Sequence, residues 1–423
     1  MSEWLGTLTG WLSANPEWLG LAIFLIACIE CLALIGILVP GVILLFSVCV
    51  LAGSGALSLG QTLLLAYSGG LLGDLLSYGL GRRFHQNIRR LPGLRQHPEW
   101  IGNAELYFRR YGVASLLAAA GWALAYIVPG WATGAALRLP LPEGFWGEAA
   151  VVAAGLALLL GLCLHSSLGG RRHTTSLAAG LSLALLLGLF VGWPHLTQFD
   201  QGLMTLVQAQ RSASMDSLMV LITRLGDLST QLAVGTLLTA LLLLSRQWRA
   251  ALFTVSALLG TALTNTALKV LFARTRPEVL IEPLNSFSFP SGHSSAAFAF
   301  FLVLGVLAGR GQPARMRLAW LVLASLPALA IALSRVYLGV HWPSDILAGA
   351  LLAGGLCACS LLLVQRQQVL TALAPRAWWL LLPACLALLG SIATWALPQA
   401  MLQYRYAPIP ATPTTVLESV REG

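Results

Sequence analysis

Three short polar clusters stand out in the second half of this 423-residue chain, which is otherwise strongly apolar. The first opens at Lys269, the only lysine among 25 basic Lys and Arg residues, and ends at Arg276-Pro277. The second is Pro290-Ser291-Gly292-His293, and the third runs from Ser334-Arg335 to Asp345. Together they supply fixed cations, two histidines and a carboxylate, the groups needed to bind a phosphate and transfer it to a histidine.

The cations and the helix start in these clusters are suited to holding a phosphate. Lys269 offers a compact point charge, whereas Arg276 and Arg335 offer planar, two-pronged donation to phosphate oxygens. Ser291-Gly292 stands just before an apolar segment, so backbone amides at a helix N-terminus would point at the anion. Glycine at this position lets the backbone approach closely. We therefore expect Lys269, Arg276, Ser291, Gly292 and Arg335 to bind phosphate.

The histidines and the carboxylate supply the reactive groups. His341 and Asp345 are four residues apart, one helical turn, so the carboxylate can reach the imidazole. An aspartate on one ring nitrogen fixes the tautomer and makes the other nitrogen a better nucleophile. His293 would protonate the leaving oxygen, a contribution on the order of 10²–10⁴-fold. We expect no metal and no cofactor, because three cations already offset the developing charge.

Each of these residues alone has a common structural explanation. A histidine near the end of a span is usually interfacial, an Arg-Pro pair is usually a loop, and an aspartate opening a span is often a helix cap. The combination favours a functional site over these separate structural explanations, because three clusters occur in order, on one predicted face, and include the only lysine.

Composition places these clusters in a membrane protein. The chain is 57% hydrophobic and 10% charged, where a soluble protein has about 25% charged residues. Apolar runs of about 18 or more residues recur from end to end, which predicts an all-α polytopic integral membrane protein. The seven cysteines lie in apolar stretches without metal-binding spacing or a disulfide framework. The apolar segments run over residues 19–38, 42–57, 59–80, 113–136, 147–166, 177–195, 230–245, 250–271, 294–309, 318–334, 345–364 and 377–397. A Pro-Gly break near residues 38–57 leaves open a re-entrant hairpin instead of full spans.

The net charge of +9 indicates orientation in the bilayer and not nucleic-acid binding. Arginines cluster at residues 82–111, 171–172, 246–249, 310–317 and 366–376, in short segments between apolar runs. By the positive-inside rule these segments face the cytoplasm, so the three polar clusters meet on the outer face. The expected location is a bacterial inner membrane with the active site on the periplasmic side.

The three clusters resemble the signatures of the type-2 phosphatidic acid phosphatase superfamily. The matching patterns are Lys-x6-Arg-Pro, Pro-Ser-Gly-His and Ser-Arg-x5-His-x3-Asp, over about residues 195–397. The resemblance implies a six-helix core and a metal-independent lipid phosphatase. It also implies a phosphohistidine at His341, polarised by Asp345, with His293 as acid and then base. The superfamily includes soluble vanadium haloperoxidases, and the membrane setting favours a lipid phosphate.

Residues 20–140 are similar to the DedA (SNARE-associated, lipid-scramblase-like) family. The similarity rests on Glu30, on the stretch from Gly36 to Gly41, and on a glycine-rich segment that contains Asp74 and ends at Arg82. Glu30, Asp74 and Arg82 are candidates for a lipid-transport or proton site, because ionisable groups in a span are costly. The chain departs from the family pattern at two places. Val42 stands where the family usually has an acidic residue, and residues 121–130 lack the arginines that the family usually has there.

These resemblances predict a fusion of two membrane domains. We expect a DedA-like domain with re-entrant segments at 1–165, a linker and connecting transmembrane helix at 166–194, a six-helix phosphatase-like domain at 195–397, and a polar tail at 398–423. The leading hypothesis is hydrolysis of undecaprenyl diphosphate at the periplasmic face for carrier-lipid recycling. Alternatives are a phosphatidylglycerophosphate or phosphatidic acid phosphatase, phosphotransfer to a glycolipid, and a lipid flippase whose phosphatase half only binds substrate. Oligomeric state stays open.

Overall fold

Helices are the regular elements of the described part of the chain. The computed structural model describes residues 2–32, 41–88, 126–171, 173–281, 284, 286–395 and 397–405. Among these residues, seven helices are long and apolar enough to cross a membrane, or up to nine spans when two bent helix pairs are included. The predicted all-α polytopic membrane fold is confirmed. The predicted break at residues 36–40, most of the 82–111 basic segment and the 121–125 stretch lie outside the described residues.

The chain divides into two compact units, Met1–Leu141 and Pro142–Gly423. This division precedes helix α7 (Phe145–Leu168), whereas the sequence predicts a boundary after residue 165. The physical reason is packing, because α7 lies against α8, α9 and α14 of the second unit. The predicted connecting helix, α8 (Thr174–Gly192), likewise packs along α15 (Pro343–Val364) inside the second unit.

The first unit is built on close contact between two helices. Its elements are α1 (Ser2–Ala14), η1 (Pro16–Trp18), α2 (Leu19–Glu30), α3 (Gly41–Leu51), η2 (Ala52–Ala56) and α4 (Leu59–Ile88), and residues 126–138 are also helical. Gly69 and Gly73 on α4 face the α2 carbonyl groups of Phe24 and Cys28, where any Cβ would overlap the backbone. These glycines therefore allow the close contact between α2 and α4.

Two bends in the first unit bear on the re-entrant prediction. The helical segments Gly6–Ala14 and Pro16–Glu30 meet at 107°, as in a broken span or a re-entrant loop. Helix α3 continues into the π-turn η2, where Gly55 adopts φ of 123°, a conformation that favours glycine. Segment Gly41–Ala56 is too short to count as a full span, so a re-entrant segment here stays a prediction.

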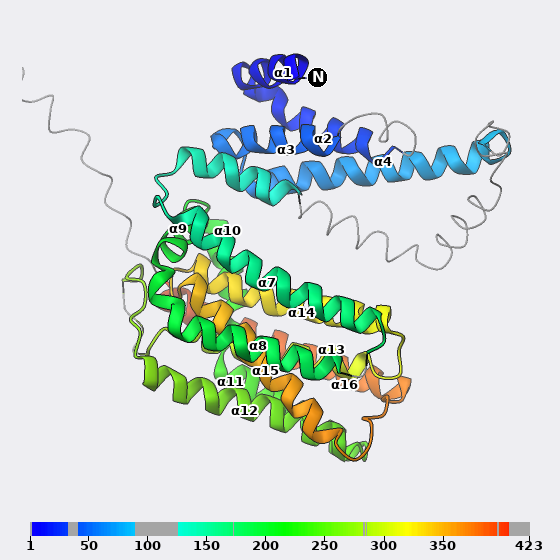
Figure 1. Ribbon diagram of the computed structural model, residues 1–423, viewed down its shortest axis with the longest axis vertical. Coiled ribbons are helices and arrows are strands. Elements are labelled where there is room, and N and C mark those ends of the chain that lie inside the picture. Colours follow the sequence, from blue (N-terminus) through cyan, green and yellow to red (C-terminus); the bar gives the residue numbers. More distant parts are fainter. Residues whose placement is uncertain are drawn as a thin grey trace, which may run out of the picture. The chain divides into compact units, whose positions relative to one another are not determined.

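The second unit is a bundle whose helices run side by side (Figure 1). Besides α7, α8 and α15 it contains η3 (Trp193–His195), α9 (Thr197–Gln208), α10 (Ala213–Arg224), α11 (Leu228–Leu244), α12 (Trp248–Phe272), α13 (Gly292–Ala308), α14 (Ala314–Tyr337), α16 (Pro375–Trp395) and α17 (Leu397–Gln403). Helix α13 lies at the centre, packed on α12, α14 and α15. Its Phe300 and Val303 are fully buried, as are Phe253 of α12 and Leu238 of α11.

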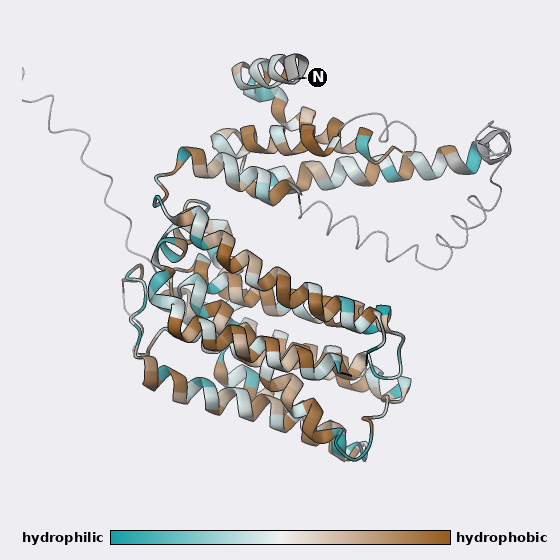
Figure 2. Ribbon diagram, viewed as in Figure 1, coloured by the Kyte–Doolittle hydropathy of each residue, from teal (hydrophilic) through white to brown (hydrophobic). Residues whose placement is uncertain are grey.

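The two ends of this bundle differ in chemistry. Hydrophobic residues cover the middle of the long helices, and hydrophilic residues gather towards the helix ends (Figure 2). The turns α11–α12, α13–α14 and α15–α16 share one end and carry the arginines at 246–249, 310–317 and 366–376. The opposite end holds the C-termini of α12 and α14 and the N-termini of α13 and α15. We call it the polar-cluster end, because all three sequence clusters lie there.

Candidate active site

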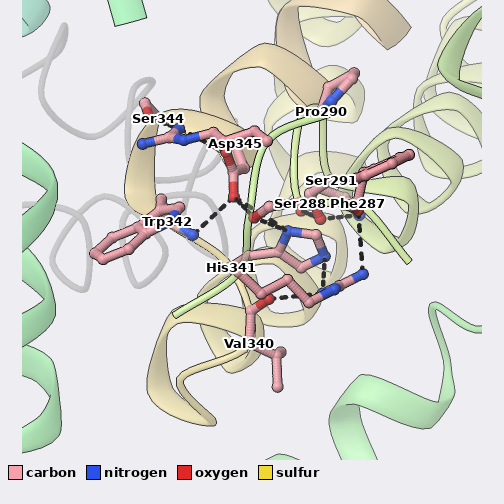
Figure 3. Close-up of polar contacts among 12 residues, drawn as sticks. Phe287, Ser288, Pro290, Ser291, Val340, His341, Trp342, Ser344 and Asp345 are labelled. Carbon is pink, nitrogen blue, oxygen red and sulfur yellow. Dashed lines mark hydrogen bonds and ion pairs between the residues drawn. The ribbon is translucent and has the colours of Figure 1, made fainter. Parts of the chain in front are cut away.

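The central group of the site is His341, which is 1% exposed and lies in the turn before α15. Its Nδ1 is 3.3 Å from Oδ2 of Asp345, and its Nε2 is 3.0 Å from Nη1 of Arg276 (Figure 3). A guanidinium N–H can only donate, so Nε2 accepts and the proton resides on Nδ1, facing the carboxylate. The geometry therefore selects the tautomer whose Nε2 lone pair points towards the cations.

The contact between His341 and Asp345 is made across a helix start and not within a helix. Helix α15 begins at Pro343, so His341 lies outside it, and Pro343 occupies the first turn, where proline is well tolerated. Asp345 is the third residue of the helix, and its Oδ2 accepts the backbone N–H of Trp342 at 2.8 Å. This capping interaction, shown in Figure 3, turns the carboxylate back towards the imidazole.

Asp345 is fully buried and its carboxylate is saturated with donors. Oδ1 accepts from Nη1 of Arg274 at 2.7 Å, and Oδ2 also accepts from the hydroxyl of Ser288. A buried carboxylate is stable as an anion only when charge and hydrogen bonds compensate for lost water. Arg274 and Ser288 supply that compensation, so they keep Asp345 able to orient His341. Sequence analysis assigned neither residue a role.

Arg274 links Asp345 to a second buried carboxylate. Its Nη2 is 2.7 Å from Oδ2 of Asp200 on α9, and Asp200 also accepts from the backbone and the hydroxyl of Ser344. The guanidinium lies 4.4 Å from the ring centroid of Trp193 and 5.6 Å from that of Trp342. Burial raises the pKa of Asp200, against the opposing effects of Arg274 and Ser344. This cage holds Arg274 in one position beneath the site.

The three predicted phosphate-binding cations converge on His341. Burial lowers the pKa of His341 well below 6.5, and the charges of Arg276, Arg335 and Lys269 lower it further. Burial and the neighbouring Arg335 also lower the pKa of Arg276 to about 10. Like charges held this close repel one another, which favours an anion between them. The predicted meeting of the clusters at one place is therefore found in the structure.

Each cation is anchored by neutral groups that leave its charge uncompensated. Lys269 donates to the carbonyl of Phe287, and Arg276 donates to the carbonyls of Ser286 and Val340 at 2.7 and 2.6 Å. Neutral acceptors fix the side chains without cancelling their charge. The cations are thus preorganised for an anion, as electrostatic stabilisation requires.

Arg335 is 1% exposed and is held by residues from two distant elements. Its Nη1 donates to Oγ1 of Thr223 on α10 at 2.7 Å and to the hydroxyl of Tyr404 at 2.8 Å. Its Nε is buried and has no hydrogen-bond partner among the described residues. A buried donor left without a partner costs about 1–3 kcal/mol, so this atom is suited to a phosphate oxygen. Sequence analysis did not identify Thr223 or Tyr404.

The Pro-Ser-Gly-His cluster opens α13, as predicted, but Ser291 is already engaged within the protein. Ser291 is the N-cap residue, and its hydroxyl accepts from the backbone and the hydroxyl of Ser294. Its backbone N–H donates to the carbonyl of Asp345 at 3.0 Å. Ser291 therefore locks α13 to α15, and the amides of the first turn, beginning at Gly292, face any bound anion. A Cβ on Gly292 would lie 3.7 Å from Cε of Lys269.

His293 has an acidic partner that sequence analysis did not identify. Its Nε2 is 2.7 Å from Oδ1 of Asp227, which precedes α11 and also pairs with Arg224. A carboxylate on one ring nitrogen orients the imidazole. Burial and the charge of Arg335 lower the pKa of His293 to about 4, and Asp227 opposes that shift. His293 also contributes to the electrostatic field at His341, so both histidines border one site.

The remaining predicted site residues lie in the first unit. The Glu30 side chain contacts Gly41, and within the described part of the chain its buried Oε2 has no hydrogen-bond partner. Glu30 and Asp74 both lie within electrostatic range of Cys31. Arg82 is exposed and lies eight residues beyond Asp74 on α4. Helices α2 and α4, which carry Glu30 and Asp74, pack against each other, and the roles of these residues stay predictions.

Comparison with protein-family models identifies both parts of the chain. The VTT domain model matches residues 39–169, and the PAP2 superfamily model matches residues 249–369. The chain joins a VTT domain to a PAP2 superfamily domain. The predicted fusion of a DedA-like part and a type-2 phosphatidic acid phosphatase part is therefore confirmed. The VTT match includes α7, the helix that packs with the second unit.

Curated relatives match the two parts separately. The undecaprenyl-diphosphatase of Sulfolobus acidocaldarius is 28% identical over 183 residues, 41% of this chain and 83% of that protein. Phosphatidylglycerophosphatase B of Bacillus subtilis is 37% identical over 92 residues, 21% of this chain and 44% of that protein. Inner membrane protein YabI of Escherichia coli is 32% identical over 97 residues, 23% of this chain and 38% of that protein. The chain thus spans less than half the length of two of these relatives.

Proposed function

We propose that the PAP2 part of the chain is a lipid phosphatase that forms a phosphohistidine at His341. The observation that carries the proposal is the pair of contacts made by the His341 ring, in which Nδ1 faces Asp345 and Nε2 faces Arg276. That arrangement makes Nε2 a nucleophile beside a preformed cation. Three cations around one buried imidazole fit a phosphoryl group better than any uncharged electrophile.

The first step is attack of His341 Nε2 on phosphorus. Arg276 now donates to Nε2, so it exchanges this bond for a phosphate oxygen when substrate enters. The Nε atom of Arg335 and the ammonium group of Lys269 hold the other oxygens, with the first-turn amides of α13. Asp345 stabilises the positive charge that develops on the imidazole, as the buried carboxylate does in a catalytic triad.

His293 is proposed to act as the general acid and then as the general base. It donates a proton to the leaving oxygen in the first step, while Asp227 holds its ring in position. In the second step neutral His293 accepts a proton from water, which attacks the phosphohistidine and releases inorganic phosphate. Acid and base are thus one residue in two protonation states.

A lipid phosphate is the substrate class that the surroundings support. The PAP2 part is built from apolar helices long enough to span a membrane, and the cluster of cations lies at one end of them. Undecaprenyl diphosphate is the leading substrate, because the undecaprenyl-diphosphatase of Sulfolobus acidocaldarius matches this chain over 83% of its own length. Phosphatidylglycerophosphate is the second candidate, supported by the relative named phosphatidylglycerophosphatase B. Phosphatidic acid and phosphotransfer to a glycolipid remain open alternatives.

The site is proposed to face the periplasm of a bacterial inner membrane. The arginines of the described turns gather at the opposite end of the bundle from the polar clusters. Arginine-rich short loops favour the cytoplasmic side. The VTT part is proposed to be a lipid-handling scaffold, with Glu30, Asp74 and Arg82 as its ionisable groups.

Phosphate release from purified protein tests the proposal. The protein in detergent, with EDTA present, would be offered undecaprenyl diphosphate, phosphatidylglycerophosphate and phosphatidic acid in parallel. We expect EDTA-resistant release that is lost in His341→Ala and kept in His165→Ala, an exposed histidine at the other end of the bundle. Release from none of the three lipids would sink the phosphatase proposal and favour a flippase. Equal release by His341→Ala would exclude the phosphohistidine.

A further inference from the structure

An apolar groove in the second unit is used by none of the steps above. It lies between α7, α8 and the first turns of α15, and its volume is about 700 Å³. Helix α7 lines it over residues 144–156, α8 over residues 185–192, and α15 at Leu347 and Leu351. This lining shares no residue with the phosphate-binding and catalytic groups described above. The groove is therefore a candidate binding site in its own right.

Helix α7, which forms one wall of the groove, is tied to its neighbours at both ends. At the arginine-rich end of the bundle, Oγ of Ser166 lies 2.9 Å from Oγ1 of Thr174, the first residue of α8. At the polar-cluster end, Oε2 of Glu148 accepts the backbone N–H of Phe199 at 2.7 Å. Between these contacts α7 runs beside α8 (Figure 1), and the groove occupies the part nearer the polar-cluster end. Contacts at both ends thus fix the walls of the groove.

The glycines that line the groove do not serve helix contact. An added Cβ on Gly147, Gly188 or Gly192 would meet no atom of the described residues within 4 Å. Gly69 and Gly73 of α4 differ, because an added Cβ there would overlap the backbone of α2. Glycines of that second kind let two membrane helices approach closely. The glycines of the groove instead leave space beside α7 and α8.

The depth and exposure of the groove match one leaflet of a bilayer. Residues 144–156 cover about 18 Å of helix axis, close to the roughly 15 Å thickness of the hydrocarbon part of one leaflet. No residue in the most apolar stretch of α7 is buried within the described structure, and Val151 of the lining is 69% exposed. The groove is therefore continuous with the lipid-facing surface of α7. An apolar space at this depth is filled by hydrocarbon, because it offers water no hydrogen-bond partners.

The charge at the mouth of the groove selects a headgroup. The ionisable side chains of the lining are Glu148 and His195, both near the polar-cluster end, and the lining includes no lysine or arginine. The Glu148 carboxylate would repel an anionic headgroup and attract an ammonium group. The His195 ring can add a hydrogen bond to a headgroup oxygen. Charge complementarity thus favours a zwitterionic lipid that carries a primary amine.

We propose that this groove, the α7–α8 groove, binds one resident lipid of the bilayer. A hydrocarbon chain occupies the space between α7, α8 and α15, and an amine-bearing zwitterionic headgroup lies beside Glu148. The chain packs against Leu347, two residues beyond Asp345, and the headgroup lies where Glu148 holds α9. The lipid therefore supports the two elements that carry Asp345 and Asp200 without contacting the reacting atoms. It is a structural lipid and not the substrate.

A photoreactive lipid and two matched leucine variants test this proposal. The protein would be placed in nanodiscs that contain phosphatidylethanolamine with a diazirine in the middle of one acyl chain, and labelled peptides would be mapped by mass spectrometry. Gly188→Leu fills the groove, whereas Gly180→Leu adds the same side chain to an exposed position of α8 outside the lining. We expect labelling of residues 185–192 to fall about tenfold in Gly188→Leu and to be unchanged in Gly180→Leu.

A second pair of variants on α7 guards against a misfolded first pair. Gly147→Leu fills the groove from the other wall, and Gly161→Leu is its exposed control outside the lining. Equal melting temperatures within a pair show that both of its members fold. Neither phosphatidylethanolamine nor phosphatidylglycerol carries a phosphate monoester or a diphosphate. The labelling result is therefore independent of the proposed phosphatase reaction.

The same diazirine chain on phosphatidylglycerol tests the headgroup. We expect it to label the groove severalfold less than the phosphatidylethanolamine probe does, and equal labelling would overturn the amine assignment. Labelling that is equal in Gly188→Leu and Gly180→Leu would show lipid of the general bilayer only, and would overturn the site. Labelling of the exposed part of α8 without any in the groove of the wild type would also overturn it, and would indicate that protein covers the groove.

Discussion

At the scale of single residues, the site consists of charged side chains. Each is held in place either by hydrogen bonds to neutral groups or by an ion pair with a group of opposite charge. Lys269, Arg276 and Arg335 are anchored mainly to carbonyl and hydroxyl oxygens, so their charge stays available. Asp345 differs from these cations, because the buried Arg274 and the hydroxyl of Ser288 both donate to its carboxylate. The difference matches their proposed roles. The cations must keep their charge free to bind phosphate, whereas the Asp345 carboxylate must stay fixed in order to orient His341.

The depressed pKa of His341 predicts an unusual pH profile. Its nucleophilic form is neutral, and burial with three nearby cations holds its pKa well below 6.5. As pH falls through 6.5 the imidazole therefore stays reactive, and the rate is lost only at lower pH. We expect the acid limb of phosphoenzyme formation to have a midpoint below 6.5. Rapid-quench measurement between about pH 4 and pH 8 checks this. Samples returned to neutral pH control for irreversible loss, and a midpoint above 6.5 contradicts the prediction.

Replacing Arg274, which does not touch the reacting atoms, is expected to lower the stability of the protein strongly. Replacing it in Arg274→Gln leaves Asp200 and Asp345 buried without their shared cation. Removing one partner of a buried ion pair costs about 3–5 kcal/mol, so we expect a clear loss of thermal stability in detergent. The double variant Arg274→Gln with Asp200→Asn should recover part of it, because one orphaned charge is gone. Equal melting temperatures for wild type and Arg274→Gln would refute this account.

At the scale of helices, the site depends on the short helix α9. It carries Asp200, and it is held by α7 through Glu148, whose Oε2 accepts the backbone N–H of Phe199 at 2.7 Å. Gly202 lets α9 approach closely, since a Cβ there would overlap the ring of Phe145. A carboxylate at the first turn of a helix satisfies its free amides and complements its dipole. Helix α7 thus supports the polar-cluster end of the bundle, although its residues fall within the VTT match.

This dependence predicts that Glu148→Gln weakens both stability and turnover. The loss of the charge–dipole contact should cost about 1 kcal/mol, and the freer α9 should hold Asp200 and Arg274 less firmly. We expect a lower melting temperature and a kcat reduced severalfold with little change in KM. Glu143→Gln, an exposed change in the turn that precedes α7, serves as the matched control. A Glu148→Gln variant identical to that control would show that α7 does not support the site.

At the scale of the whole molecule, the two ends of the bundle are predicted to face opposite sides of the membrane. Ser214→Cys places a thiol near the polar-cluster end, and Gln367→Cys places one at the arginine-rich end. In intact spheroplasts we expect a membrane-impermeant maleimide to label Ser214→Cys, and to label Gln367→Cys only after permeabilisation. Wild-type protein controls for the seven native cysteines, which lie in apolar segments. The reverse labelling pattern would place the site on the cytoplasmic side.

Sequence reasoning reached the helical membrane fold, the two families and the convergence of three clusters. Each of these features is encoded by residues that are close together in the sequence. Long apolar runs have few alternatives to spanning helices, and each cluster sits at a helix end where its neighbours set its direction. Successive helices alternate in direction, so clusters at Arg276, His293 and His341 meet at one end of the bundle.

The sequence did not determine the partners that hold these residues or the division into compact units. Asp200, Asp227, Thr223 and Tyr404 lie far along the chain from the groups they contact, in segments without any distinctive pattern. Their roles arise only when short amphipathic helices fold over the polar-cluster end. The position of α7 was settled in the same way, because an apolar helix packs on whichever surface complements it. Spacing along the chain indicated which groups are proposed to react, and tertiary packing decided which partners hold them in place.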